Sequence, residues 1–314
     1  MKMIATVFAL LLSATAEGSN EISAIKLHRH SANHHAWSTN AYFLESASGV
    51  VLIDAQLLAS DAKTLAAMIK STGKPLLGVF ITHPHLDHYG GLPELKAQLG
   101  EFPVYASKDT ADHMKEVHEQ MLGFFKVPNR FGEALDSRVS AATNIFTNGK
   151  TLSLAGIEFT IHDLGPGEAK NNIIIYQKDL NLVFAGDIFY PHTHYYLGEG
   201  RIAGARGHLE FILKNYDPET AILGGHTNPA RAKQATEQIA YIDFVEMLTA
   251  EAMATNENLT DEGNLTSDAR SSVIAKVIEH YPHYGDFFYR PEQFLQGNIY
   301  GTENYLKQKA AKGK

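Results

Sequence analysis

Short apolar runs and helix-like periodicities alternate along the chain from residue 22 onward. Runs rich in apolar and β-branched residues predict strands at residues 42–45, 50–54, 77–82, 103–106, 151–154, 157–163, 172–177, 182–185 and 221–223. Apolar residues three or four positions apart predict helices at residues 61–69, 108–122, 208–216, 231–249, 267–279 and 291–312. A β-rich part followed by helices therefore occurs twice, which favours two packed sheets with helices outside over one doubly wound sheet.

The first 16 residues have a different pattern from the rest of the chain. Lys2 gives a positive start, an apolar run follows, and Ala14-Thr15-Ala16 resembles a small-residue cleavage site. Together these features are typical of a secretory signal peptide. The apolar run is shorter than a membrane-spanning helix. We therefore expect an exported protein, periplasmic or secreted, without stable membrane insertion after cleavage near Ala16; an uncleaved membrane anchor is the alternative.

Two later segments also interrupt the alternation of strands and helices. Residues 123–144 contain Gly, Pro and Asn without a clear period, which predicts a long loop or lid. Residues 255–264 are polar and predict a domain boundary. The expected organisation is a signal peptide at residues 1–16, a main domain at 17–254 and a C-terminal helical extension at 255–314.

Composition narrows the possible chemistry. The 314 residues include no cysteine and 16 histidines, and the formal net charge is −8. The acidic balance argues against a nucleic-acid partner, which would require a basic face. The lack of cysteine excludes thiolate nucleophiles, iron–sulfur clusters and zinc sites of the cysteine type. Any metal must therefore be held by histidines and carboxylates.

Four side chains suited to metal binding lie within six residues, directly after the apolar run at residues 77–81. They are His83, His85, Asp87 and His88. Ligands usually bind where strands end, and strand alternation would place His83 and His85 on the same side. Such a concentration of imidazoles and a carboxylate is difficult to explain as core packing, because buried polar groups need partners. The pattern predicts a metal site.

This His-x-His-x-Asp-His motif resembles that of the metallo-β-lactamase fold hydrolases, and the similarity extends over roughly residues 22–250. The resemblance implies an α/β (α+β) fold, a four-layer αββα sandwich of two mixed β-sheets flanked by helices. It also implies two divalent metal ions. His83 and His85 would bind one ion, and Asp87 and His88 would bind the other.

Later segments match further motifs of this family in the expected order. Asp187, after the apolar run at 182–185, matches a metal-bridging aspartate, and His226 matches the last histidine ligand of the second ion. The third motif departs from the family, because Glu168 stands where the family has a histidine. Glu168 could itself be the ligand, as in the alkylsulfatase branch, or His162 could replace it. We favour Glu168.

The resemblance also implies a mechanism. A hydroxide bridging the two metals would attack the substrate, with Asp87 or Asp187 orienting it. Tyr190 resembles a tyrosine of the lactonase branch and is a candidate general acid; an aromatic residue in a packed loop is the alternative. Because a carboxylate is a harder donor than imidazole, Glu168 predicts zinc sites that also tolerate Mn²⁺ or Fe²⁺.

The segments on either side of the expected centre suggest how a substrate is enclosed. Residues 28–40, which include Trp37, would form a flap with an apolar cover. The aromatic run at residues 190–196 would form a substrate wall; a protein-interaction surface is the alternative.

The sequence thus predicts an exported, dinuclear, metal-dependent hydrolase that cleaves a cyclic amide, lactone or ester bond of a small molecule. The absence of cysteine excludes the β-lactamases that use a cysteine ligand. The alternatives are an alkylsulfatase-like hydrolase and a diiron member of the same fold that reduces oxygen or nitric oxide. That diiron class normally works with a flavin-carrying partner.

Overall fold

The computed structural model describes residues 25–124, 133–285 and 291–312 of the chain. The predicted signal peptide and part of the predicted loop at residues 123–144 lie outside these residues. In the described part, the strands form two six-stranded sheets, ordered β1-β2-β3-β4-β5-β6 and β12-β11-β10-β9-β8-β7. The first sheet contains β1 (Lys26–Ser31), β2 (Asn40–Glu45), β3 (Val50–Ile53), β4 (Leu76–Phe80), β5 (Val104–Ala106) and β6 (Asn144–Ile145). The second contains β7 (Thr151–Leu154), β8 (Ile157–Gly165), β9 (Asn172–Gln177), β10 (Leu182–Gly186), β11 (Ala221–Gly224) and β12 (Ala230–Arg231).

Both sheets mix parallel and antiparallel pairs. In the first sheet, β1, β2 and β3 pair antiparallel, whereas β3, β4, β5 and β6 pair parallel. In the second, β10 and β11 pair parallel and the other neighbours pair antiparallel. The predicted sandwich of two mixed sheets is therefore confirmed.

The two sheets pack face to face through alternating side chains. Tyr42 and Leu44 of β2 belong to the same buried cluster as Ile173 and Ile175 of β9. The residue between the first pair, Phe43, belongs to the other cluster, which includes the helices. Because successive strand residues point to opposite faces, a strand buried on both faces is apolar throughout, as β2 and β3 largely are.

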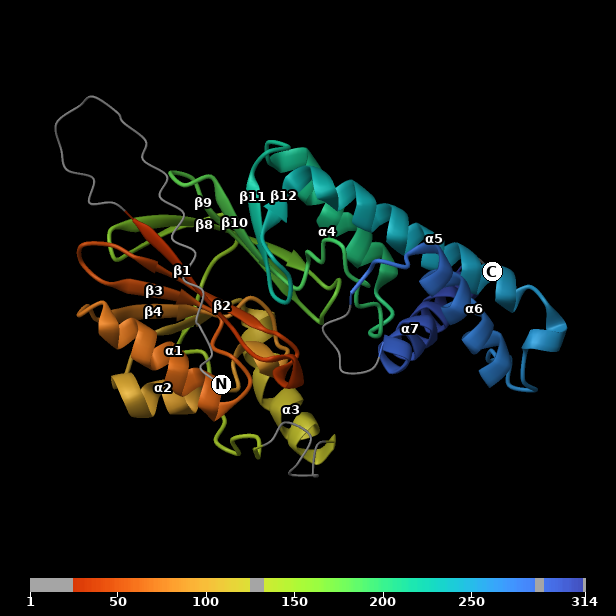
Figure 1. Cartoon of the computed structure of the whole chain (residues 1–314), viewed down its shortest axis with the longest axis horizontal. Coiled ribbons are helices and arrows are strands. Elements are labelled where there is room, and N and C mark those ends of the chain that lie inside the picture. The colour runs from red at the N-terminus through yellow and green to blue at the C-terminus, as the bar shows by residue number, and fades with distance from the viewer. Residues whose placement is uncertain (1–24, 125–132, 286–290, 313–314) are drawn as a thin grey trace.

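Helices cover the outer faces of the sandwich. They are α1 (Ala59–Ser71), α2 (Leu92–Leu99), α3 (Lys108–Phe124), α4 (Ile202–Asn215), α5 (Ala235–Met253), α6 (Ser267–His280) and α7 (Pro291–Lys312). Figure 1 shows α1 and α2 beside the first sheet and α4 and α5 beside the second, with α6 and α7 alongside α5. The domain boundary near residue 254 stays a prediction. None of the described helices is both long and apolar enough to cross a membrane.

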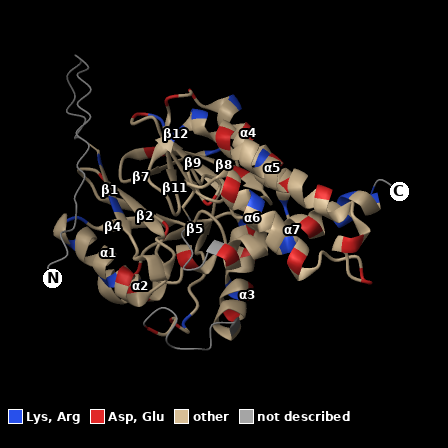
Figure 2. Cartoon of the chain, turned by 45° about the vertical axis from the view of Figure 1, so that its right-hand side comes forward, with Lys and Arg blue, Asp and Glu red and all other residues tan. Residues whose placement is uncertain are grey.

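Acidic and basic residues are interspersed along these helices (Figure 2). Arg206 of α4, for example, reaches Asp243 and Glu246 of α5, with 2.7 Å between Arg206 Nη2 and Glu246 Oε2. Such pairs suit a solvated helix surface, where each contributes about 1 kcal/mol or less.

Some elements differ from the sequence-based expectation. Strand β1 is absent from the prediction because its sequence, KLHRHS, is polar and lies on a sheet edge, so it has no apolar run. Helix α2 is also absent from the prediction, because it spans only eight residues between Gly91 and Gly100. Helix α5 begins at Ala235 rather than at residue 231, because residues 230–234 form β12 and a 3₁₀ turn.

Candidate metal centre

The candidate ligands follow the ends of four strands. His83, His85, Asp87 and His88 come after β4, and Glu168 follows β8. Asp187 and His226 follow β10 and β11. Because β8, β10 and β11 run in the same direction within one sheet, their C-terminal ends lie at one edge. The sandwich places the loop after β4 opposite this edge.

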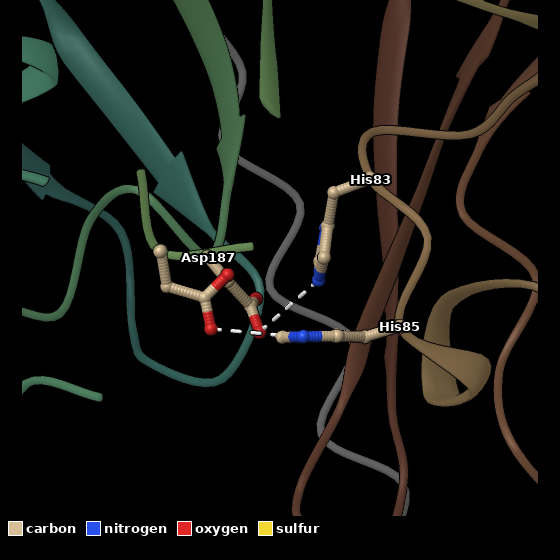
Figure 3. A group of neighbouring side chains, drawn as sticks. His83, His85 and Asp187 are labelled. Atoms are coloured by element: carbon tan, nitrogen blue, oxygen red, sulfur yellow. Dashed lines mark ion pairs between the residues drawn. The ribbon is translucent and has the colours of Figure 1, made fainter. Parts of the chain in front are cut away.

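The structure brings all seven predicted ligands together in two sets. In each set, one nitrogen or oxygen atom per residue lies within 4.8 Å of those of the other members. Group one consists of His83, His85, Glu168 and Asp187, and group two consists of Asp87, His88, Asp187 and His226. Figure 3 shows His83 and His85 reaching from one side toward Asp187 on the other. Asp187 belongs to both groups, as its predicted bridging position requires.

The histidine nitrogens and carboxylate oxygens of each group lie close to one another, around a common small space. His83 Nε2 lies 3.5 Å from Asp187 Oδ2, and His85 Nδ1 lies 3.5 Å from Glu168 Oε1. In group two, His88 Nε2 lies 3.3 Å from Asp187 Oδ1, and His226 Nε2 lies 2.9 Å from Asp187 Oδ2. Each of these histidines therefore directs one ring nitrogen into the centre.

The other ring nitrogen of each histidine is anchored outside the centre. The pairs are His83 Nδ1 with Thr82 Oγ1 (2.9 Å), His85 Nε2 with Glu199 Oε1 (3.0 Å), His88 Nδ1 with Asp54 Oδ2 (2.7 Å) and His226 Nδ1 with the Trp37 carbonyl (2.7 Å). Such outer partners fix the ring orientation of metal-binding histidines. The inner nitrogens are thereby held ready to bind a cation.

Asp54 is a candidate supporting residue that the sequence analysis does not identify. Its carboxylate accepts hydrogen bonds from the backbone N–H and the hydroxyl of Thr82, at 2.9 and 2.8 Å, besides the contact with His88. Asp54 has a left-handed backbone (φ 61°), a conformation that is concentrated at functional sites in residues other than glycine. Its position directly after the buried strand β3 is the one signal in the sequence.

Gly225 allows the strand edge to approach the centre. A Cβ at this position would collide with the carboxylate of Asp187 and would lie 2.8 Å from His88 Cε1. Glycine is therefore required by the close approach of the backbone to the candidate ligands.

Burial and mutual attraction shift the pKa values in this centre. Burial alone would raise the pKa of Asp87. The imidazoles of His88 and His226 outweigh burial and hold this pKa well below its usual range. Burial opposes a charge on His226, but Asp187 and Asp87 outweigh this and raise its pKa to about 10. Burial raises the pKa of Glu168 to about 8, despite the nearby His85. The carboxylates of Asp187 and Asp87 therefore favour protonated His226, and burial favours protonated Glu168, at neutral pH.

The residues present fit divalent cations. Buried atoms without a hydrogen-bond partner in the described part of the chain include His83 Nε2, His88 Nε2 and Asp187 Oδ1, all of which face the centre. Buried polar atoms normally have partners, and those left unpaired need an explanation such as a bound ion. Imidazole nitrogens and carboxylate oxygens are ligands for zinc, manganese and iron.

Metal binding at neutral pH is expected to release protons, because bound histidines and carboxylates must be deprotonated. The raised pKa values of His226 and Glu168 mean that these groups hold protons at pH 7. Metal affinity will therefore increase as the pH rises from 6 to 8. Calorimetric titration of Zn²⁺ in buffers of different ionisation enthalpy measures this release, and heats that are identical in all buffers would contradict it.

Tyr190 lies beside group one. Its side chain is 1% exposed, and its hydroxyl donates a hydrogen bond to Glu168 Oε1 at 3.3 Å. Burial and the nearby carboxylates of Asp187 and Glu168 raise its pKa well above 10. The contact shows that Tyr190 orients Glu168; its role as a general acid stays a prediction.

The two alternatives for the third motif lie in different places in the structure. His162 lies on β8, with its ring 5.2 Å from that of Phe211, and belongs to neither group. Glu168 belongs to group one.

Trp37, the suggested apolar cover, is buried in the structure. It is 7% exposed, has a left-handed backbone (φ 59°) and forms part of the buried core. Its backbone carbonyl contacts the centre through His226 Nδ1 at 2.7 Å.

A polar cavity of about 720 Å³ adjoins the centre on the side of His226. It lies between the β1–β2 connection and the segment after His226, and its lining contains Arg29 and Arg231. The described residues that line it include neither Asp nor Glu. The cavity suits a negatively charged group.

Comparisons with known proteins agree with the fold and the arrangement of the centre. The family model of the metallo-beta-lactamase superfamily matches residues 36–226, and the chain belongs to this superfamily. The predicted class of metal-dependent hydrolase is thereby confirmed.

Individual relatives are distant. The chain is similar to a probable metallo-hydrolase of Streptococcus pyogenes (27% identity, covering 51% of this chain and 65% of that protein). It is also similar to the metallo-beta-lactamase IND-1 of Chryseobacterium indologenes (25% identity, covering 60% and 72%). A solved structure of a sec-alkyl sulfatase variant superposes with a TM-score of 0.63 at 17% identity, covering 90% of this chain and 49% of that one.

Proposed function

We propose that the protein is a dinuclear hydrolase that cleaves a cyclic amide, lactone or ester bond of a small molecule. The observation that carries this proposal is the pair of groups that share Asp187. Two cations in such sites act together on the nucleophile and the leaving group. Zinc is the proposed ion, with Mn²⁺ or Fe²⁺ tolerated, because group one contains two carboxylates.

The proposed site of action is outside the cytoplasm, in the periplasm or after secretion. This proposal is supported by the sequence of residues 1–16, which has the charge, apolar run and small-residue ending of a signal peptide.

The protein's own side chains would position the reactants. Divalent cations, when bound, supply Lewis acidity that activates water and polarises a carbonyl oxygen. Thr39 Oγ1 donates to Asp87 Oδ2 at 2.9 Å and fixes this carboxylate. Asp87 and Asp187 stay ionised, because both pKa values lie well below the usual range. Each carboxylate can therefore accept a hydrogen bond from a nucleophilic water and orient it. Tyr190 holds Glu168 in place.

The surroundings of the centre support a substrate that carries a negative group. The cavity beside His226 presents two arginines, Arg29 and Arg231, without a lining acid. Arginine is suited to carboxylate and phosphate recognition. Two similar proteins, named a metallo-beta-lactamase and an acyl-coenzyme A thioesterase, support an acyl substrate.

Hydrolysis of a substrate panel tests this function. The panel contains a chromogenic cephalosporin, a lactone, an aryl ester and an acyl thioester, each assayed after reconstitution with Zn²⁺, Mn²⁺ or Fe²⁺. We expect turnover of at least one acyl substrate, its loss on addition of EDTA, and its absence in His85→Ala. Lack of turnover of every substrate with every metal would refute the hydrolase proposal.

A second candidate, an alkylsulfatase-like activity, is favoured by the Glu168-Ala169 pair in the third motif. Likeness to the sulfatase structure, at 17% identity, supports the fold alone. A secondary alkyl sulfate in the same panel separates the two candidates, since sulfate release without acyl hydrolysis would favour the second. A diiron redox centre, the third alternative, would instead show stoichiometric iron in the purified protein.

A further inference from the structure

Helix α7 contacts the wall of the metal centre through a buried amide. Asn298 is fully buried, and its Oδ1 accepts a hydrogen bond from the backbone N–H of Leu197 at 2.7 Å. Its Nδ2 donates to the backbone carbonyl of Tyr195, also at 2.7 Å. One side chain from the C-terminal part of the chain therefore fixes two backbone groups of the segment between β10 and α4. We call residues 195–199 the rim segment.

Two further contacts hold α7 against the rim segment. Gly301 packs so closely that a Cβ there would collide with the carbonyl of Leu197 and would lie 2.8 Å from Gly198. The ring of Phe294 lies 5.7 Å from the ring of Tyr196. Helix α7 thus meets the rim segment through a glycine, an aromatic ring and a buried amide. Because both polar atoms of the amide are paired with particular backbone groups, the amide fixes the position of α7 along the rim segment.

The rim segment in turn holds a ligand of group one. Glu199 Oε1 lies 3.0 Å from His85 Nε2, while His85 Nδ1 faces Glu168 at 3.5 Å. The side chain of His85 is 21% exposed, whereas those of the other ligands shown in ion pairs are at most 5% exposed. Packing therefore restrains His85 less than the other candidate ligands. The orientation of its ring depends correspondingly more on its hydrogen-bond partner, Glu199.

From this chain of contacts we propose that Asn298 is a positioning residue of the metal centre. Asn298 fixes the backbone of the rim segment, the rim segment places Glu199, and Glu199 orients His85 toward group one. Helix α7, at the far end of the sequence (Figure 1), is in this view a part of the centre rather than a separate appendage. The inference rests on the proposed two-ion site.

Cobalt titration of the full-length protein tests the proposal, because the visible spectrum of bound Co²⁺ reports each site without an activity assay. We expect Asn298→Ala and Glu199→Ala each to weaken one of the two binding events by about tenfold to a hundredfold, the usual effect of losing an outer partner of a metal-binding histidine. The other binding event should keep its affinity. The double variant should resemble Glu199→Ala alone, because both residues act through His85.

Two matched variants separate positioning from general destabilisation. Ile157→Ala truncates a buried residue of β8 that belongs to a different core cluster from Leu197 of the rim segment and Phe294 of α7, and should leave both cobalt affinities unchanged. Glu199→Gln keeps a hydrogen-bond acceptor for His85 and should restore most of the affinity lost in Glu199→Ala. If Asn298→Ala does not fold, Asn298→Asp takes its place, because it keeps the acceptor for the Leu197 N–H and removes only the donor to the Tyr195 carbonyl. The Glu199 variants, at a partly exposed residue, test the last contact of the chain separately.

The outcomes distinguish this inference from the proposed function. Two unchanged affinities in Asn298→Ala or in Glu199→Ala, with a wild-type protein that binds two ions, would overturn the inference alone. Equal weakening of both binding events, or additive effects in the double variant, would also overturn it. A wild-type protein that binds no cobalt would remove the proposed two-ion site and the inference together.

Discussion

Replacement of Asp187 by alanine will reduce hydrolysis by a factor of about 10⁴ or more, the scale seen when one member of a catalytic unit is removed. Asp187 is the one ligand that belongs to both groups, and its two oxygens approach His88 and His226 at 3.3 and 2.9 Å. Its loss removes the shared carboxylate, takes away the carboxylate nearest to His226 and leaves His88 Nε2 without one of its two carboxylate neighbours. We expect both metal affinities to fall.

Metal analysis and steady-state kinetics of Asp187→Ala, measured on protein dialysed against limiting Zn²⁺, check this prediction. Asp179→Ala is the matched control, because Asp179 is an exposed aspartate in the turn before β10. The control should keep the metal content and activity of the wild type. Retention of two ions and of more than a tenth of the activity in Asp187→Ala would contradict a bridging role.

Replacement of Glu168 by alanine is expected to remove one of the two ions and to lower kcat/KM by about a hundredfold, within the range for a lost ligand or supporting partner. Glu168 belongs only to group one, so group two should keep its ion. Glu168→His introduces an imidazole at this position. This variant should restore the ion of group one and shift the metal preference of that group from Mn²⁺ or Fe²⁺ toward Zn²⁺.

His162→Ala is the control for Glu168, because His162 is the other candidate that the sequence offers. In the structure its ring packs against Phe211 outside both groups. Its truncation should leave metal content unchanged. Loss of an ion in His162→Ala, with retention in Glu168→Ala, would reverse the assignment of the third motif.

The sequence points to the candidate ligands through local signals. His83, His85, Asp87 and His88 stand within six residues after an apolar strand, so a single segment carries the evidence. The order of strands and helices likewise predicts the two packed sheets. Glu168, Asp187 and His226 are weaker signals in isolation and depend on a resemblance in motif order.

The partners of the ligands are not predictable from the sequence in the same way. Asp54 contacts His88 from 34 positions away, and Glu199 contacts His85 from 114 positions away. Asn298 lies 101 positions beyond the backbone group that it binds. Such pairs form only when the two sheets and α7 pack together. The sequence around a polar residue does not indicate which distant group will be its hydrogen-bond partner.

The centre also joins two parts of the chain that are far apart in sequence. His83 and His85 come from the first sheet, whereas Glu168, Asp187 and His226 come from the second. Cations that bind both sides stabilise the folded state by mass action, in proportion to the logarithm of their free concentration. The fraction of the protein that is folded will therefore depend on the supply of metal in the compartment where the two sheets assemble.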